Sequence, residues 1–207
     1  MVSKLIKEIK KNSPDCNLDI SEFNKLSQIL LSKDYLSFLK ETNGGSIFNT
    51  ALHFYGVLSN EVDSEIFYNN YLLKKYYSQL INFLLAFAED AFGNQYVFLE
   101  DNRIGLVNIE TAEIDCLFTS FEHFITEVYK EPEYYTGYPI IKKWVQKNGL
   151  ITDFKRLCPI KPFVIGGDYE IDNFYVLEKD KLLDYNSFIA QQIKDLPDGT
   201  VIQLKVI

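Results

Sequence analysis

The spacing of apolar residues predicts several amphipathic helices along the chain. In the segments 21–31, 34–42 and 121–130, apolar residues recur every three or four positions and share one helical face. Thr119 and Glu122 have the spacing of a capping box that begins the third helix. We expect the second and third helices to bury Tyr35, Phe38, Leu39, Phe121, Phe124 and Ile125. Further helices are predicted at 65–80, 140–147 and 184–196.

Other stretches have the alternating or continuously apolar pattern of β-strands. Strands are predicted at 51–57, 83–88, 95–99, 104–109, 113–118, 162–165, 174–177 and 201–206. Short connections, such as the polar turn at 100–103, make consecutive strands neighbours in an antiparallel sheet. We therefore predict an α+β fold, in which a mainly antiparallel twisted sheet carries helices packed on one face.

Two polar motifs are predicted to reverse the chain direction, and we assign their residues a structural role. The motif residues are Asn43, Gly44, Gly45, Asp90, Gly93 and Asn94. The first motif follows the helix at 34–42 and ends it, because Asn and Gly accept the left-handed conformation. The second is expected to form a tight turn between two paired strands.

A chain of 207 residues is long enough for one large domain or two small ones. Hydrophobic residues make up 47% and charged residues 24%, which is typical of a globular protein and excludes disordered, collagen-like and coiled-coil chains. Pro132 and Pro139 flank a Tyr-rich loop. We therefore predict a core domain at 1–130 and a C-terminal α/β extension at 131–207 that packs on it.

The net charge of −8 is concentrated in one part of the chain. Residues 100–135 hold two basic and nine acidic residues. Such a balance argues against nucleic-acid binding and favours a basic protein partner. We predict a partner-binding surface made of Glu100, Asp101, Glu110, Glu113 and Asp115 as charged groups, with Tyr134 and Tyr135 as aromatic anchors. The alternative is a solvated acidic face beside a Tyr-lined loop.

No catalytic or metal-binding motif is visible. His53 and His123 lie seventy positions apart; His53 is expected to be half-buried in a strand and His123 exposed. Cys16, Cys116 and Cys158 are widely spaced, which fits neither a disulfide framework nor a zinc site and indicates a reducing compartment. We predict no catalytic residues, no metal and no cofactor.

The pair Glu89-Asp90 directly follows a buried strand. Carboxylates at a strand end commonly accept backbone N–H groups, and we favour that interpretation over a catalytic pair. The longest apolar stretch, 83–88, is far shorter than the ~20 residues of a membrane span, and no signal peptide is visible. We expect a soluble, cytoplasmic protein that does not contact a membrane and is a monomer.

Three segments carry a resemblance to a known family. Residues 34–45 read DYLSFLKETNGG, which resembles the DYxxFLxxxNGG helix and stop of the SUKH superfamily. Residues 87–98 are similar to its second signature, an apolar strand followed by a D-x-x-G-N turn, and residues 120–125 are similar to its closing SFEEFL helix. The resemblance covers roughly 21–130. It departs from the family at residue 32, where Ser replaces the usual Pro.

This resemblance implies a non-enzymatic binding protein. The superfamily includes fungal cell-wall assembly regulators and bacterial immunity proteins that neutralise a cognate toxin, often a nuclease. Because nucleases hold phosphate backbones in basic clefts, an acidic inhibitor is electrostatically complementary to them. Two alternatives remain: an intracellular regulatory scaffold that resembles the cell-wall regulators, and an enzyme whose site includes His53 or the Glu89-Asp90 pair.

Overall fold

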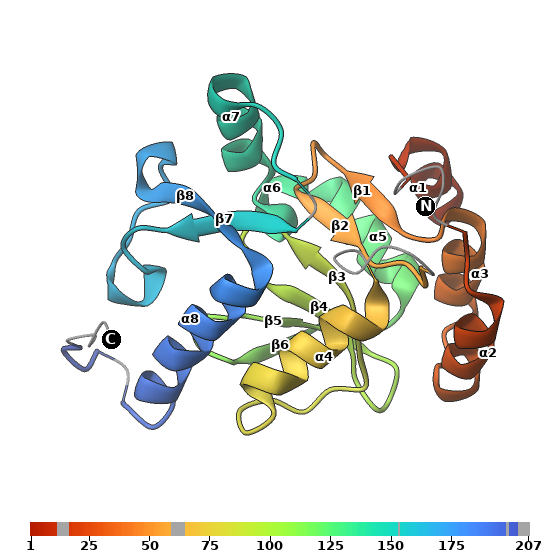
Figure 1. The fold of residues 1–207 in the computed structure, drawn as a ribbon, viewed down its shortest axis with the longest axis horizontal. Coiled ribbons are helices and arrows are strands. Elements are labelled where there is room, and N and C mark those ends of the chain that lie inside the picture. Colours follow the sequence, from red (N-terminus) through yellow and green to blue (C-terminus); the bar gives the residue numbers. More distant parts are fainter. Residues whose placement is uncertain (12–16, 59–64, 153, 198, 203–207) are drawn as a thin grey trace.

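The centre of the fold is a six-stranded antiparallel sheet in which the strands follow the order β1 to β6 (Figure 1). This computed structural model describes residues 1–11, 17–58, 65–152, 154–197 and 199–202. The strands are β1 (Gly45–Ile47), β2 (Leu52–Phe54), β3 (Leu85–Asp90), β4 (Gln95–Phe98), β5 (Ile104–Val107) and β6 (Ile114–Phe118). Consecutive strands are neighbours throughout, which confirms the predicted α+β class and antiparallel order.

Helices cover both faces of this sheet, whereas the sequence predicted them on one. They are α1 (Val2–Glu8), α2 (Ile20–Ile29), α3 (Lys33–Thr42), α4 (Ile66–Tyr77), α5 (Phe121–Lys130), α6 (Pro132–Thr136), α7 (Tyr138–Asn148) and α8 (Lys179–Ile193). On one face α3 and α5 pack against the sheet. On the other face lie α4 and α8 (Figure 1), and the Asn70 side chain of α4 bonds both backbone groups of Ala86 in β3.

An aromatic core joins α3 and α5 to the sheet. The ring centroid of Tyr35 lies 5.3 Å from Phe87, 5.1 Å from Phe98 and 5.2 Å from Phe121. All six side chains that were predicted to be buried on these two helices are fully buried. Each aromatic pair of this kind contributes about 0.5–1.5 kcal/mol beyond simple burial. Rings from both helices and from two strands thus form one packed aromatic layer.

The N-cap of α5 lies one residue later than predicted, at Ser120 rather than Thr119. Ser120 is the N-cap, and its hydroxyl oxygen accepts the backbone N–H of His123 at 3.1 Å. With Ser120 as the cap, the third helical residue is His123 rather than Glu122, so a capping box is not formed. His123 is half-buried rather than exposed.

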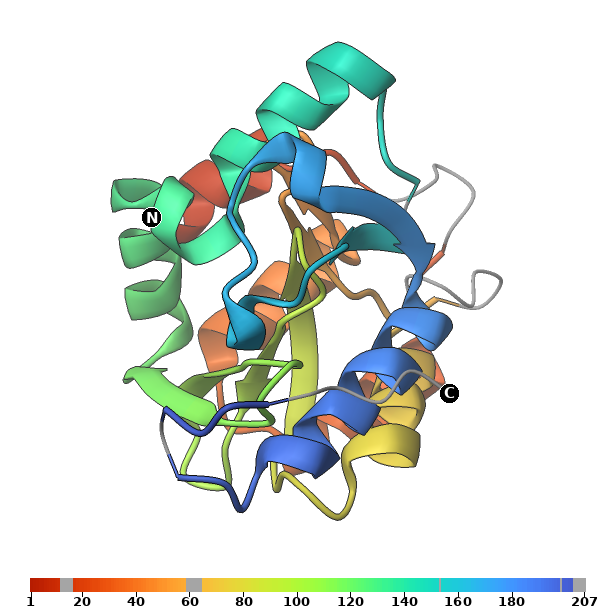
Figure 2. The same ribbon diagram turned by 90° about the vertical axis from the view of Figure 1, so that its left-hand side faces the viewer.

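The C-terminal part adds a two-stranded antiparallel hairpin of β7 (Lys155–Pro159) and β8 (Phe174–Glu178), followed by α8. Figure 2 shows these elements together on one side of the sheet. Cys158, Leu182, Leu183 and Ala190 belong to the same apolar core as the six-stranded sheet. The segment after residue 130 therefore packs extensively on the part before it.

Predictions in the C-terminal part are mixed. The strand at 174–177 is confirmed as β8, but the strand at 162–165 is wrong, because Phe163–Ile165 form a 3₁₀ turn, η1. Pro162 precedes that turn, and Gly166 closes it with a left-handed φ of 83°. A second 3₁₀ turn, η2, spans Ile171–Asn173. Of the predicted closing strand, 203–206 lies outside the described residues, and the described residues 201 and 202 belong to no strand.

Candidate functional site

Asp90 organises the turn between β3 and β4. Its Oδ1 accepts the backbone N–H groups of Phe92 at 2.8 Å and Asn94 at 2.9 Å, and its Oδ2 accepts the Asn94 side-chain amide at 2.9 Å. Burial raises the pKa of this carboxyl group to about 7, although these hydrogen bonds act in the opposite direction. The donors that surround Asp90 belong to its own turn.

Asn94 and Gly93 connect the same turn to more distant elements. The Asn94 side-chain oxygen accepts the backbone N–H of Ile109 at 3.1 Å, beyond the end of β5. Gly93 has a φ of 85°, and a Cβ atom there would lie 2.7 Å from the Cδ2 atom of Leu182 in α8. A side chain at position 93 would therefore combine backbone strain with a clash.

The first predicted motif, which contains Asn43, Gly44 and Gly45, lies at the end of α3. Asn43 adopts the left-handed conformation there, and its side-chain oxygen accepts the backbone N–H of Val57 at 2.9 Å. A Cβ atom on Gly44 would lie 2.6 Å from the carbonyl oxygen of Phe54, so the chain passes too close to β2 for any side chain. Gly45 then begins β1. α3 thus ends at the predicted place, next to a strand that was not predicted.

A buried polar cluster surrounds Glu89, the residue before Asp90. The Glu89 Oε1 atom lies 2.5 Å from Arg156 Nη2, 3.0 Å from Lys179 Nζ and 3.3 Å from His53 Nδ1. All four side chains are at most 5% exposed. The two cations hold the pKa of Glu89 well below its usual range, despite burial, which acts in the opposite direction. Burial is the main cause of a lowered pKa of His53.

This cluster joins the two parts of the chain, because Glu89 and His53 come from β3 and β2, whereas Arg156 and Lys179 come from β7 and α8. The sequence analysis did not reveal it: neither cation lies in a segment to which a helix or strand was assigned. Glu89 is buried, and its Oε1 atom already has three nitrogen partners, while Oε2 accepts the Gln95 side-chain amide at 3.4 Å. The cluster is therefore suited to structural attachment rather than to substrate chemistry.

The exposed residues of the predicted acidic surface form two groups, one at each end of the β5–β6 pair. Glu100 and Asp101 are exposed at the turn between β4 and β5, where Asp101 pairs with Arg103 at 2.6 Å. Glu113 and Asp115 are exposed at the opposite end of β5, before and within β6. The four carboxylates thus flank the edge strand β6 from both ends and do not form a compact patch.

Glu110 is not an exposed charged group, and that part of the prediction is wrong. Its side chain is 5% exposed, and its two carboxylate oxygens accept the backbone N–H groups of Phe163 at 3.2 Å and Val164 at 3.1 Å. Burial raises the pKa of Glu110. The sequence could not reveal this because the partners lie more than fifty residues further along the chain.

The two predicted anchors lie beside the same edge strand. Tyr135 is half-buried, and its ring centroid lies 5.3 Å from that of Phe118 at the end of β6. Tyr134 is 76% exposed and meets Tyr135 edge-on, with centroids 4.9 Å apart. One tyrosine is therefore fixed against the core, and the other projects outward.

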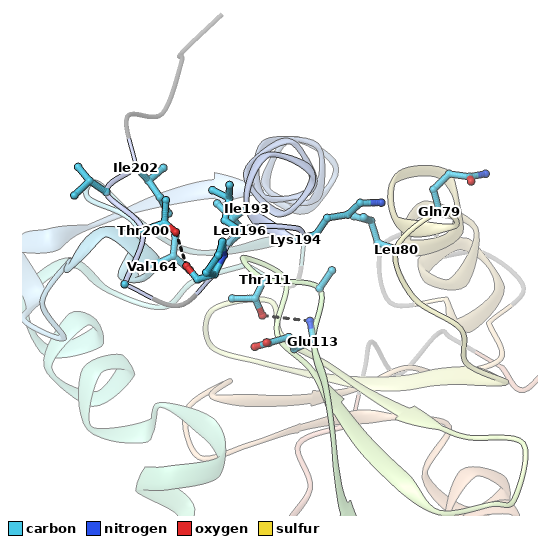
Figure 3. Close-up of a pocket in the computed structure, with 14 residues that line it drawn as sticks. Gln79, Leu80, Thr111, Glu113, Val164, Ile193, Lys194, Leu196, Thr200 and Ile202 are labelled. Atoms are coloured by element: carbon cyan, nitrogen blue, oxygen red, sulfur yellow. Dashed lines mark hydrogen bonds between the residues drawn. The ribbon is translucent and has the colours of Figure 1, made fainter.

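Two pockets are lined by residues of the predicted acidic surface, one by Glu113 and one by Glu110. The larger, about 600 Å³, lies between the end of α4, the turn between β5 and β6, and the segment 193–202 (Figure 3). Thr111 and Glu113 line it from the turn, and the Thr111 hydroxyl accepts the Glu113 backbone N–H at 3.2 Å. The smaller, about 220 Å³, includes Glu110 among its lining residues.

Within the described part of the chain, no three His, Cys, Asp or Glu side chains gather in a way that could hold a metal ion. Cys116 is exposed and Cys158 is buried, both as free thiols, and Cys16 lies outside the described residues. Among the described helices, none is both long and apolar enough to cross a bilayer.

The order of elements defines an α+β protein built on a six-stranded antiparallel sheet. The chain belongs to the SMI1 / KNR4 family (SUKH-1), whose model matches residues 17–127. A crystal structure of Atu4351 from Agrobacterium tumefaciens has a similar fold, with a TM-score of 0.59 and 11% sequence identity over 90% of this chain and 88% of that chain. A comparison with curated protein sequences finds no match. Members of the family are commonly immunity proteins and are generally non-catalytic.

Proposed function

We propose that this protein is an immunity protein that neutralises a cognate toxin by binding it, without catalysing a reaction. Membership of the SMI1 / KNR4 family over residues 17–127 carries the proposal. The net charge of −8 supports a basic partner such as a nuclease, because complementary charge accelerates association and favours correct partners.

The binding face that we propose follows the edge strand β6. Glu113 and Asp115 supply charge at one end, and the turn that carries Glu100 and Asp101 lies at the other. Tyr134 is exposed beside this edge, and tyrosine contributes a large contact area at a small entropic cost. Glu110 does not belong to this face, because its side chain is buried.

A growth assay tests the proposal. The product of the neighbouring gene in the native genome is expressed in a bacterial host, with or without this protein. We expect that product to arrest growth and this protein to restore it. A matched control is the Phe121→Asp variant, which places a charge at a fully buried core position and should not rescue. Continued arrest in the presence of the folded wild-type protein would contradict the proposal.

A further inference from the structure

The smaller pocket, which we call the Glu110 pocket, has among its lining residues Phe92, Glu110, Phe163, Val164, Tyr169 and Asn186. It lies where the turn after β5 meets η1 and α8. Its interior side chains, including Phe92 and Asn186, are buried, whereas Asn108 and Tyr169 at its rim are exposed. The pocket, of about 220 Å³, therefore combines buried polar groups with apolar and aromatic walls and has exposed residues among its lining.

A buried acceptor among the residues that line this pocket has no hydrogen-bond donor in the described part of the chain. Asn186 is 1% exposed, and its Oδ1 atom has no hydrogen-bond partner among the described residues. Its amide nitrogen donates to the Leu182 carbonyl at 3.0 Å, so the unpartnered atom is the oxygen. A buried acceptor without a donor destabilises the fold, and a ligand donor in the pocket would remove that cost.

Glu110 is a buried carboxyl group that lacks a cationic partner within the part of the chain that the structure describes. Among the described residues its carboxylate accepts the two backbone N–H groups of η1 and forms no ion pair. A carboxylate offers about four lone-pair sites, so each oxygen can accept a further donor. A buried carboxylate is normally matched by a cation, as Glu89 is by Arg156 and Lys179.

The walls of the pocket specify the kind of cation. Phe163 and Tyr169 are stacked with centroids 4.0 Å apart, and Phe92 meets each of them edge-on at 5.8 Å. Aromatic faces attract cations, and a guanidinium group stacks on them particularly well because it is planar and weakly hydrated. A guanidinium also has five N–H donors, which suits several separate acceptor oxygens better than a compact ammonium.

We propose that the Glu110 pocket binds a guanidinium group, which donates to the Glu110 carboxylate and to Asn186 Oδ1 and packs against the aromatic wall. The group can belong to a small molecule or to an arginine side chain of a protein. This binding goes beyond the proposed function, because the site is complete within this chain and does not require a toxin.

Titration of the full-length protein with propylguanidinium, followed by amide chemical shifts, tests the proposal. We expect saturable shifts at Glu110, Phe163, Val164 and Asn186. Propylurea, which has nearly the same shape and no charge, should bind at least about tenfold more weakly, a difference of about 1.4 kcal/mol. An acetylated Gly-Arg-Gly amide is the second arm: tighter binding than propylguanidinium indicates an arginine side chain, and equal or weaker binding indicates a small molecule.

Two variants and one control locate the site. Glu110→Gln removes the charge and should weaken propylguanidinium binding at least about tenfold. Tyr169→Ala removes an exposed wall, so it should weaken binding without unfolding the protein even if Glu110→Gln proves unstable. Glu41→Gln removes an exposed charge on α3, outside the pocket, and should leave binding unchanged. Equal affinity for propylurea, shifts confined to other residues, or unchanged binding by the folded variants would overturn the proposal.

Discussion

At the scale of single residues, Asp90 is the clearest determinant of stability, because its carboxylate accepts three hydrogen bonds within one turn. Asp90→Ala leaves these donors without a partner, and we expect a loss of about 2–4 kcal/mol in the free energy of unfolding. Denaturant unfolding measures this loss. Asp90→Asn, which retains one acceptor oxygen, is the milder control. A loss below about 0.5 kcal/mol for the Ala variant would contradict the structural role.

Asp90 also carries a pH dependence of defined sign. Its pKa is about 7 in the folded protein against 3.8 as the ordinary value, so the folded state holds the proton more tightly than the unfolded chain. Ionisation therefore destabilises the fold, and stability from this group falls as the pH rises from about 4 to about 7. We expect the melting temperature of wild type relative to Asp90→Asn to be higher at pH 5 than at pH 8. A melting temperature relative to Asp90→Asn that is higher at pH 8 than at pH 5 would contradict a raised pKa.

The residue scale also shows where sequence reasoning reaches its limit. Asp90 and Asn94 could be identified because their partners lie within the same turn. Glu110 could not, because only the folded chain brings it beneath Phe163 and Val164. A side chain whose environment comes from distant residues carries no local pattern that distinguishes a buried acid from an exposed one.

At the scale of elements, the cluster around Glu89 attaches β7 and α8 to β3. Glu89→Gln leaves Arg156 and Lys179 buried without a counter-charge, which typically costs about 3–5 kcal/mol. We expect a loss of that size in the free energy of unfolding, measured with urea. Glu100→Gln removes an exposed acid and should change stability by less than about 0.5 kcal/mol. Equal effects of the two substitutions would refute the attachment role.

The same cluster explains why β7 and the start of α8 were not predicted. β3 to β6 have apolar patterns that reveal them directly, and α3 and α5 have clear faces. β7 contains Lys155 and Arg156 and was missed, because Arg156 is buried through its pairing with Glu89 rather than through an apolar side chain. α8 begins at Lys179, five residues before the predicted start, for the same reason: Lys179 is buried by Glu89 and Asn69.

At the scale of the whole molecule, we propose that the 1–130 core and the 131–207 extension unfold together. They share one apolar core and the buried Glu89 cluster. Trp144, the single tryptophan, lies in α7 of the extension and packs against an apolar cluster that also contains Ala51 and Ala91 of the core. Its fluorescence therefore reports on the extension where it meets the core. We expect thermal transitions followed by Trp144 fluorescence and by far-ultraviolet circular dichroism to have the same midpoint. Separate midpoints would show that the extension is an independent unit.

The proposed face along β6 predicts how association with a basic partner depends on charge. The double variant Glu113→Lys, Asp115→Lys should slow association and flatten its salt dependence, because exposed carboxylates act on the encounter and are screened beyond about 8 Å at physiological salt. A control with the same net charge is Glu41→Lys, Asp184→Lys, which changes exposed acids on α3 and α8. Equal association rates for the two variants, measured by stopped flow, would place the interface elsewhere.

The central claim is that this protein acts by binding a cognate toxin. Titration calorimetry of the purified protein with the product of the neighbouring gene, carrying an inactivating substitution, tests it most directly. We expect a stoichiometric complex with a dissociation constant in the nanomolar range, about −12 kcal/mol, because a weaker inhibitor would leave free toxin in the cell. Absence of binding heat at micromolar concentrations, with both proteins folded, would contradict the account.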